Sequence, residues 1–380
     1  MKQIFLDYAS ATPVSSAVRT AMEPYFSSVF YNPSALYLAA KLAKSKLELA
    51  RTTVAGLLAV HASEVIFTAG STEANNLAVR GIMKNFSNAH CIVSAIEHES
   101  VLHTAHLYDV SHLPVLPNGI IDLSAFMALV KDTTVLVSCM LANNEIGSVQ
   151  PIAELAKLVA AVRLERRTQG NTRPIYLHTD ASQAYNYMQV LPHTLGADMV
   201  VIGGSKIYGP KQTAVLFLKT GIKLQSQITG GGQEWGLRSG TENLAGCVGL
   251  AAALYETATL RKAETKRLML LRSHFIAELC NRFETVLING TQKYRLPNNV
   301  HITLPGTDNE TLIMQLDEAG IMAAAGSACS ASSDEPSHVL KAIGLSTTDA
   351  QSSLRFTMGR ATTQADIDYT VATLGSLLHR

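Results

Sequence analysis

Residues 175–211, IYLHTDASQAYNYMQVLPHTLGADMVVIGGSKIYGPK, decide the fold of this chain. The stretch contains two apolar runs, residues 175–180 and 198–204, which are separated by a segment near the length of one crossover. Asp180 closes the first run, and Lys206 follows a Gly-Gly bend after the second. A crossover connection joins parallel strands of one sheet. We therefore expect both strand ends to lie side by side at one edge of a sheet.

The same pattern extends to both sides of this stretch. Further apolar runs with strand character occur at residues 64–69, 90–95, 134–140 and 214–219, and helical patterns lie between them, for example at residues 154–167. Short apolar runs that alternate with helical patterns are typical of parallel strands joined by helical crossovers. The sequence therefore predicts a layered α/β fold.

A change in composition near residue 256 predicts a second domain. Residues 244–256 form an apolar run that we interpret as a buried helix, and the charged helical pattern after it leads into shorter elements. At roughly 100–200 residues per domain, a chain of this length has room for two domains. We expect a large domain of residues 15–255 and a small domain built from residues 1–14 and 256–380.

The composition excludes two classes of protein. Lys and Arg number 31 and Asp and Glu 30, so the chain lacks the charge excess of proteins that bind nucleic acids or membrane surfaces. The first ten residues, MKQIFLDYAS, contain no long apolar stretch, and residues 244–256 are too few to span a bilayer. We expect a soluble, cytoplasmic protein that binds neither nucleic acid nor membrane directly.

The five cysteines fall into two groups. Their odd number and the absence of a CxxC motif argue against a disulfide framework and a zinc knuckle. Cys91, Cys139, Cys247 and Cys280 lie in strand-like or helical patterns, and we expect them to be small buried hydrophobic residues. Cys329 lies in AAAGSACSASSDEP, a run of small residues that cannot form the wall of a core. Its thiol is therefore available for chemistry.

The pair formed by Asp180 and Lys206 indicates a cofactor. Taken alone, Lys206 is most simply a surface lysine, and Asp180 is at least as well explained as the cap of a strand end. Side by side, the two groups are what pyridoxal 5'-phosphate (PLP) requires. The amine forms a Schiff base, and the carboxylate keeps the pyridine nitrogen protonated so that the ring accepts electrons. We therefore predict a PLP site between them.

Residues 68–76, TAGSTEANN, are the candidate for the phosphate site. Small residues precede a helical run there. The backbone N–H groups of Gly70, Ser71 and Thr72 at the start of a helix would bind a phosphate, with the Thr72 hydroxyl adding a bond. The alternative is that the Ser-Thr-Glu pattern serves only to cap the helix.

Further polar side chains follow other apolar runs. His98, in IEHES, could stack on a pyridine ring and move protons near neutral pH. Asn144 and Gln183 offer amide donors for the phenolate oxygen of the cofactor. His103 and His106 have helical spacing, but no third ligand accompanies them, so we predict no metal site.

A family resemblance rests on motifs that occur in order along the chain. They are LDYASATP, YNPS, TAGSTEANNLAVRG, EHES, ANNEIGSVQP, HTDASQ, KIYGPK, RSGTEN, GSACSASSDEPSHVLKAIGL and SSLRFTMGR. With these motifs the chain resembles the cysteine desulfurases of the NifS/IscS type over nearly its whole length. The resemblance implies fold type I of the PLP-dependent transferases, with a mainly parallel seven-stranded sheet in the large domain. It also implies a smaller α+β C-terminal domain that carries the catalytic cysteine, and a homodimer with active sites at the interface.

The resemblance further implies a reaction and a role for each matching residue. L-Cysteine would be converted to L-alanine, and its sulfur would be held as a persulfide on Cys329 until a sulfur-acceptor protein takes it. Lys206 would carry PLP and move the Cα proton, while Arg355, assisted by Asn32, would bind the substrate carboxylate. The remaining roles concern the cofactor: Asp180 at the pyridine nitrogen, His98 on the ring, Asn144 and Gln183 at the phenolate oxygen, and Thr72 with Thr241 of the partner subunit at the phosphate.

The chain departs from the family pattern near the phosphate. The family has Ser-Gly-His before the PLP lysine, whereas this chain has Gly203, Gly204 and Ser205. One hydroxyl donor and one imidazole donor are therefore missing, and we expect Ser205 to replace part of them. Two other positions also differ, since Gln212 stands where the family has glycine and Leu38 where it has histidine.

Other functions remain open on the sequence alone. A selenocysteine lyase or an aminotransferase of the same fold would share the site, although an aminotransferase would not need a thiol at position 329. A low-activity homologue that only scaffolds sulfur transfer is supported by Gly203 and Ser205. The sulfur acceptor is open as well: an iron–sulfur scaffold, a tRNA-thiolation enzyme, a sulfur-carrier protein or DNA-sulfur-modification machinery.

Overall fold

The computed structural model describes residues 3–326 and 336–378, and its largest unit is a seven-stranded sheet. The strands, in spatial order, are β2 (Val65–Thr68), β8 (Ala214–Leu218), β7 (Met199–Gly203), β6 (Tyr176–Asp180), β5 (Thr134–Ser138), β3 (His90–Ser94) and β4 (Asp109–Leu113). Four of the six strand pairs are parallel, and β8 is antiparallel to both of its neighbours. The predicted α/β fold with a mainly parallel seven-stranded sheet is confirmed.

All six apolar runs predicted as strands lie in this sheet, and only β4 is missing from the prediction. The other six strands are buried along almost their whole length, because a sheet covered by helices on both faces buries every side chain. β4 is an edge strand in which only Leu113 is buried. Its sequence, DVSHL, therefore lacks the continuous apolar run that identified the inner strands.

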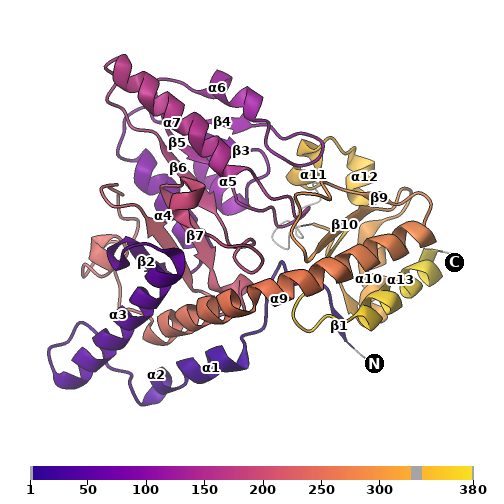
Figure 1. Ribbon diagram of the computed structural model, residues 1–380, viewed down its shortest axis with the longest axis horizontal. Helices are drawn as coiled ribbons and strands as arrows, with labels where there is room; N and C mark the ends of the chain where they lie inside the picture. The colour runs from indigo at the N-terminus through magenta and orange to yellow at the C-terminus, as the bar shows by residue number, and fades with distance from the viewer. Residues whose placement is uncertain (1–2, 327–335, 379–380) are drawn as a thin grey trace.

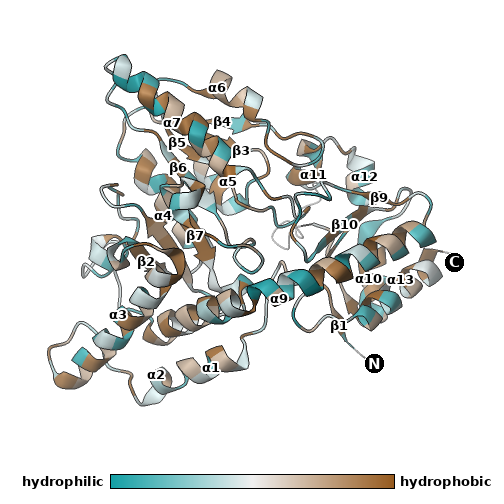
Figure 2. Ribbon diagram, in the orientation of Figure 1, coloured by the Kyte–Doolittle hydropathy of each residue, from teal (hydrophilic) through white to brown (hydrophobic). Residues whose placement is uncertain are grey.

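Helices cover both faces of the sheet (Figure 1). One face packs against α4 (Ser71–Met83) and α5 (Glu99–Ala105), and the other against α3 (Leu38–Leu58), α7 (Ile152–Thr168) and the first half of α9 (Leu244–Arg282). Successive residues of β7 point to opposite cores: Val200 and Ile202 belong to the core with α9, and Met199 and Val201 to the core with α4. This alternation follows from the two-residue period of a strand. The strands accordingly appear brown in Figure 2.

The C-terminal third of the chain builds smaller sheets. β12 (Ser353–Thr357), β10 (Asn299–Thr303) and β9 (Leu287–Ile288) form an antiparallel sheet, and β1 (Ile4–Phe5) pairs in parallel with β11 (Ile321–Met322). A separate apolar core, which includes Leu6, Phe275 and Phe356, joins these strands to α10 (Asn309–Glu318), α13 (Gln364–Leu378) and the second half of α9. The α+β character predicted for this part of the chain agrees with this arrangement.

Helix α9 connects the two parts (Figure 1). It is one unbroken helix of 39 residues, so the boundary predicted between residues 255 and 256 falls inside it. Residues 256–282 are rich in Ala, Leu, Glu, Lys and Arg, which favour helix and let α9 continue where its surface becomes polar. The proposed domain limits stay a prediction. Neither α9 nor any other helix within residues 3–326 and 336–378 is long and apolar enough to cross a membrane.

The cysteine predictions have mixed outcomes. Cys91, Cys139 and Cys247 are buried, as expected, and burial raises the pKa of Cys91 to about 12. The prediction for Cys280 is wrong, because its side chain is exposed. Its neighbour Leu279 belongs to the C-terminal core, and successive helical residues point about 100° apart. Cys280 therefore turns away from that core.

Candidate active site

A cavity of about 120 Å³ lies at the carboxyl ends of the central strands. Asp180 is the last residue of β6, while His98, Met140 and Lys206 follow β3, β5 and β7. This edge is where α/β proteins bind their ligands. The side chains that line the cavity come from Ala9, Ser10, Ser71, His98, Met140, Ala142, Asn144, Asp180, Ser182, Gln183, Lys206 and Arg355.

The cavity brings together seven of the residues singled out from the sequence. They are Ser71, His98, Asn144, Asp180, Gln183, Lys206 and Arg355. Among the residues described, five others proposed for the site do not line it: Gly70, Thr72, Ser205, Asn32 and Thr241. Thr241 is exposed and borders a second cavity of about 190 Å³ together with Gln212. Cys329 lies outside the described residues.

Asp180 is held rigidly at the end of β6. Its carboxylate accepts hydrogen bonds from the Asn75 amide and from the backbone N–H of Ser182, both at 2.8 Å. β6 and β7 are parallel, with Asp180 opposite Val201, so the expectation that the two strand ends lie side by side is confirmed. Bonds to a charged carboxylate are strong, and they fix its orientation toward the cavity.

The groups beneath Asp180 carry no charge near neutral pH. Ser138 bonds to Nδ1 of His178 at 2.8 Å and to the Glu97 carboxyl at 3.2 Å, and all three side chains are buried. Burial, with a further contribution from Asp180, raises the pKa of Glu97 to about 8. Burial lowers the pKa of His178 to about 4. Both groups are therefore neutral at pH 7.

His98 faces the cavity as a neutral imidazole. Its Nδ1 accepts a hydrogen bond from the backbone N–H of Ser100 at 3.1 Å, so the ring proton belongs on Nε2. Burial lowers the pKa of His98, and the charge of Lys206 lowers it further against the opposing effect of Asp180. The Asn75 amide that binds Asp180 also donates to the Ser100 hydroxyl at 2.9 Å. Asn75 and Ser100 thus form a chain of hydrogen bonds that positions both Asp180 and His98.

Lys206 follows β7 after one short turn, η3 (Gly204–Lys206). Its Nζ donates to the backbone carbonyl of Ser10 in the cavity, and its own carbonyl accepts from the Asn186 amide. Both contacts tie the lysine to segments that are remote in sequence. The amine is therefore held in the cavity rather than projecting into solvent as a surface lysine.

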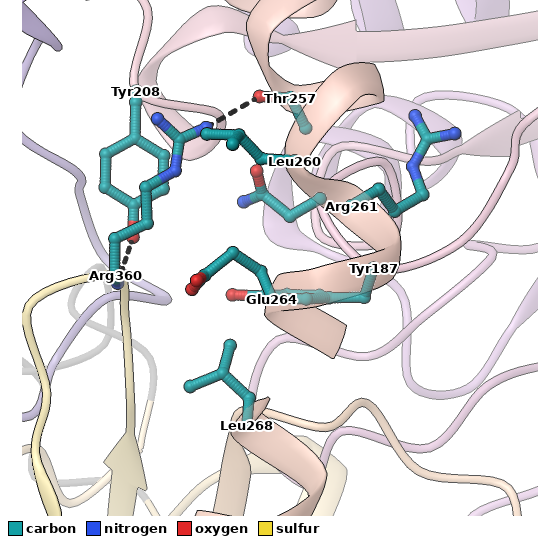
Figure 3. A pocket seen from close by; sticks show the side chains of 9 residues that line it. Tyr187, Tyr208, Thr257, Leu260, Arg261, Glu264, Leu268 and Arg360 are labelled. Atoms are coloured by element: carbon teal, nitrogen blue, oxygen red, sulfur yellow. Dashed lines mark hydrogen bonds between the residues drawn. The ribbon is translucent and has the colours of Figure 1, made fainter. Parts of the chain in front are cut away.

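The segment after Lys206 is anchored from the C-terminal part of the chain. Tyr208 adopts a left-handed backbone with φ of +61°, which is uncommon for a residue with a side chain. Figure 3 shows the Arg360 guanidinium over the Tyr208 ring, 3.9 Å from its centre, and the backbone N–H of Arg360 bonded to the Tyr208 hydroxyl. Arg360 also pairs with Glu256 of α9 at 2.7 Å. These contacts hold the strained turn and, through it, the backbone at Lys206.

Arg355 enters the cavity from β12 and is almost fully buried, with 1% of its surface exposed. Its guanidinium pairs with Asp7 at 2.7 Å and donates to the carbonyl of Asn144 at 3.1 Å. Its Nε, by contrast, finds no acceptor among the described residues. A buried guanidinium whose Nε–H group has no acceptor among the described residues is suited to bind a planar carboxylate ligand.

We expect Arg355→Lys to raise the KM for L-cysteine, the substrate that the resemblance implies, by about tenfold or more. Lysine keeps the charge opposite Asp7 but loses the planar fork, and a hydrogen bond to a charged group contributes about 1.5–3 kcal/mol. Steady-state kinetics on cofactor-loaded protein measure the change. Arg19→Lys, on the exposed part of α1 (Ser16–Met22), is the matched control. An unchanged KM in the Arg355 variant would remove Arg355 from the substrate site.

Helix α4 begins at the cavity, which its first residue, Ser71, lines. Gly70, with φ of +111°, precedes Ser71, the first residue of the helix. The first N–H groups of an α-helix have no intrahelical partner and attract anions. The N-cap residue is Gly70, which forms no side-chain capping bond, and the Glu73 carboxylate accepts from the backbone N–H of Ala69 at 3.1 Å. The Ser71 hydroxyl lies 3.1 Å from that of Ser182.

The residues of the cavity fit pyridoxal phosphate. A lysine amine, a carboxylate and a neutral imidazole line the walls, together with the first residue of a helix, whose first N–H groups have no intrahelical partner. Gln183 uses one amide proton on the carbonyl of Ala9 at 2.9 Å, which leaves the second proton for a ligand. The carboxylate suits the pyridine nitrogen of PLP, the lysine amine its aldehyde, the imidazole its ring face and the helix start its phosphate.

Sequence reasoning missed several residues that build the site. Ser182 lies between two predicted residues in DASQ, and Ser10 lies in the LDYASATP motif, so a motif-wide search could have included both. Asn75 and Ser100 also lie in quoted motifs, TAGSTEANNLAVRG and EHES, but nothing in those motifs indicates what the two side chains do. Their amide and hydroxyl become important only because α4 and α5 pack side by side against the end of β6.

Comparisons with known proteins agree with this geometry. The family model described as aminotransferase class-V matches residues 4–370. The chain is 36% identical to the protein named cysteine desulfurase IscS from Dictyoglomus turgidum, in an alignment that covers all of this chain and 95% of the relative. Among solved structures, a NifS-like protein matches over 100% of both chains with a TM-score of 0.90 and 28% identity. SspA in complex with cysteine matches over 94% of this chain and 99% of that chain, with a TM-score of 0.81 and 30% identity.

Proposed function

The chain belongs to the class V aminotransferase family, and on that premise we propose that it converts L-cysteine to L-alanine and holds the sulfur as a persulfide on Cys329. It is a PLP-dependent enzyme of the cysteine desulfurase type. The observation that carries the proposal is the meeting of Lys206, Asp180, His98 and Arg355 in one cavity. Cysteine bound in the related SspA structure supports the choice of substrate.

Each residue contributes to one part of the reaction. PLP, when bound, supplies an electron sink for charge that develops at the substrate Cα. Asp180 would stabilise a protonated ring nitrogen, and His98 would stack its neutral ring on the cofactor. Lys206 would hold the cofactor, and its amine would remove the proton from the substrate Cα. Arg355 orients the substrate through its carboxylate.

The other proposed roles concern the ends of the cofactor and the substrate. Asn144 and Gln183, which line the cavity, would bind the phenolate oxygen, and Gln183 has an unused amide proton for this bond. The start of α4, at Ser71 and Thr72, supplies N–H groups to the phosphate. Ser205, Thr241 of the partner subunit and Asn32, as an assistant to Arg355, remain proposals from the resemblance.

The chain on both sides of Cys329 is fixed beside the cavity. Before it, Ala324 and Arg355 exchange two backbone hydrogen bonds. After it, Ser337 bonds to Glu145 at 2.6 Å and His338 bonds to the carbonyl of Glu97, next to His98. Described residues at both ends therefore contact the walls of the site, which supports Cys329 as the residue that meets the substrate.

The sulfur transfer balances without an added oxidant. The Cys329 thiolate attacks the substrate sulfur, the S–S bond forms as the C–S bond breaks, and the electron pair stays with the carbon fragment. Protons return to that fragment, which leaves as alanine, and Cys329 keeps the persulfide. The net change is L-cysteine plus a protein thiol to L-alanine plus a protein persulfide.

The test is a single-turnover assay of the cofactor-loaded protein with L-cysteine. We expect alanine and protein-bound persulfide in equal amounts, measured by amino-acid analysis and by the mass increase of one sulfur on the peptide with Cys329. A 2-oxo acid in place of alanine would indicate an aminotransferase. No product with bound cofactor would indicate a protein that only scaffolds sulfur transfer.

A homodimer is the assembly that the exposed apolar surface supports. Leu38, Leu42 and Leu49 of α3 are 82%, 48% and 59% exposed, and their spacing places them on one side of the helix. An apolar stripe of this kind is typical of a surface that another protein covers. We propose that a second copy covers it.

We expect the double variant Leu42→Glu/Leu49→Glu to shift the protein from dimer to monomer, because each added charge would have to be buried in the interface. Sedimentation equilibrium measures the mass directly. Met314→Glu, on the distant helix α10, is the matched control, since Met314 is 66% exposed. A double variant that stays dimeric would place the interface elsewhere.

The persulfide requires a partner that can accept sulfur. The chemistry calls for a protein with a thiol or another nucleophile, and iron–sulfur cluster assembly fits the IscS names of the relatives. A cytoplasmic location is also part of the proposal, since a reducing compartment keeps a catalytic thiol free. Capture of the labelled sulfur from purified persulfide protein identifies the acceptor.

A further inference from the structure

The backbone conformation at position 203, at the end of β7, does not require a glycine. Its φ of −92° and ψ of 132° lie in the β region, which any residue adopts. What excludes a side chain is the Ser71 hydroxyl. A Cβ placed on residue 203 would lie 2.1 Å from Ser71 Oγ and 3.3 Å from Ser182 Oγ. Ser71 therefore occupies the space into which a side chain at position 203 would project.

The Ser71 hydroxyl is held in place by a short chain of hydrogen bonds. The backbone N–H of Gly203 donates to Ser182 Oγ at 3.1 Å, and Ser182 Oγ lies 3.1 Å from Ser71 Oγ. A hydroxyl has one proton and two acceptor positions. When Ser182 donates to Ser71, the Ser71 proton is free for a ligand in the cavity that Ser71 lines with Lys206.

Ser205 has a different environment. Its carbonyl accepts from the backbone N–H and the hydroxyl of Thr12, both at 3.0 Å, and its side chain is not among those that line the cavity. The structure therefore supports Ser71 better than Ser205 as the residue that replaces the missing donor.

We propose that the Ser71 hydroxyl is a side-chain donor to the PLP phosphate in this chain, and that side chains at positions 71 and 203 exclude each other because the Ser71 hydroxyl fills the space between them. The proposal rests on the proposed function only in that PLP binds this cavity. It predicts a reciprocal dependence: a serine is tolerated at position 203 only when position 71 is small.

The test is a double-mutant cycle read by PLP affinity. Apo protein is titrated with PLP for the wild type, Ser71→Ala, Gly203→Ser and the double variant, and thermal unfolding of each apo protein is recorded. Ser71→Ala should weaken PLP binding by about tenfold or more, since a donor to a charged acceptor is lost. Gly203→Ser should lower both affinity and apo stability, and the double variant should recover much of both.

Two comparisons keep the outcomes separate. Ser273→Ala, an exposed hydroxyl on α9, is the matched control and should bind PLP like the wild type. Ser205→Ala should weaken PLP binding less than Ser71→Ala. Equal affinity in Ser71→Ala and the wild type, or a Gly203→Ser defect that Ser71→Ala does not relieve, would overturn the proposal. A wild-type protein that binds no PLP would instead overturn the proposed function.

Discussion

Replacing Lys206 with alanine should abolish alanine production and the borohydride-reducible link between protein and cofactor. Lys206 supplies the amine fixed in the cavity, and its backbone is anchored through Asn186 and the strained turn at Tyr208. Loss of a general base alone typically costs a factor of about 10²–10⁴ in rate. Here the covalent attachment of the cofactor is lost as well, so the rate of alanine production should fall by more than this factor.

Lys211→Ala is the matched control for this variant. Lys211 is exposed and lies five residues further along the same segment, outside the residues that line the cavity. Mass spectrometry after borohydride reduction should find PLP on the wild type and the control but not on the Lys206 variant. Alanine production in Lys206→Ala at more than a few per cent of the wild-type rate would show that another group acts as the base.

Replacing Cys329 with serine should separate substrate binding from sulfur transfer. Cofactor and L-cysteine should still bind, because Lys206 and Arg355 do not depend on the thiol. No persulfide should form, since a serine hydroxyl is scarcely ionised near pH 7 and cannot hold the sulfur as a persulfide. The cysteine-induced change in cofactor absorbance reports binding, and sulfur-labelled substrate with mass spectrometry reports transfer.

Cys280→Ser supplies the control for thiol loss. Cys280 is the exposed cysteine among the residues described, so its thiol is the one among them that a diffusing reagent can reach. Its variant should form persulfide at the wild-type level. Undiminished persulfide formation by Cys329→Ser would overturn the mechanism, and loss of PLP from that variant would mean that residue 329 serves the structure of the site.

The central sheet could be predicted from the sequence because buried strands have an apolar composition. Strands covered on both faces are apolar at every position, so β6 and β7 are recognisable as runs, and the spacing between them brings Asp180 beside Lys206. The polar edge strand β4 escaped prediction for the same reason. Cys280 shows a further limit, because a helical pattern indicates a helix but not which face meets the core.

What only the tertiary structure decided are contacts between segments far apart in the chain. Asp7 reaches Arg355 across 348 residues, and Asn75 joins Asp180 to the support of His98. Gly203 is the sharpest case, since its backbone dihedrals are ordinary and its lack of a side chain is explained only by the Ser71 hydroxyl beside it. The sequence by itself determined which elements form and which reactive groups stand at their ends, because local composition and spacing encode both. Packing decided the hydrogen bonds that orient those groups. Such a bond forms or fails with a change of a few tenths of an ångström in the distance between donor and acceptor, and no local sequence pattern records a difference of that size.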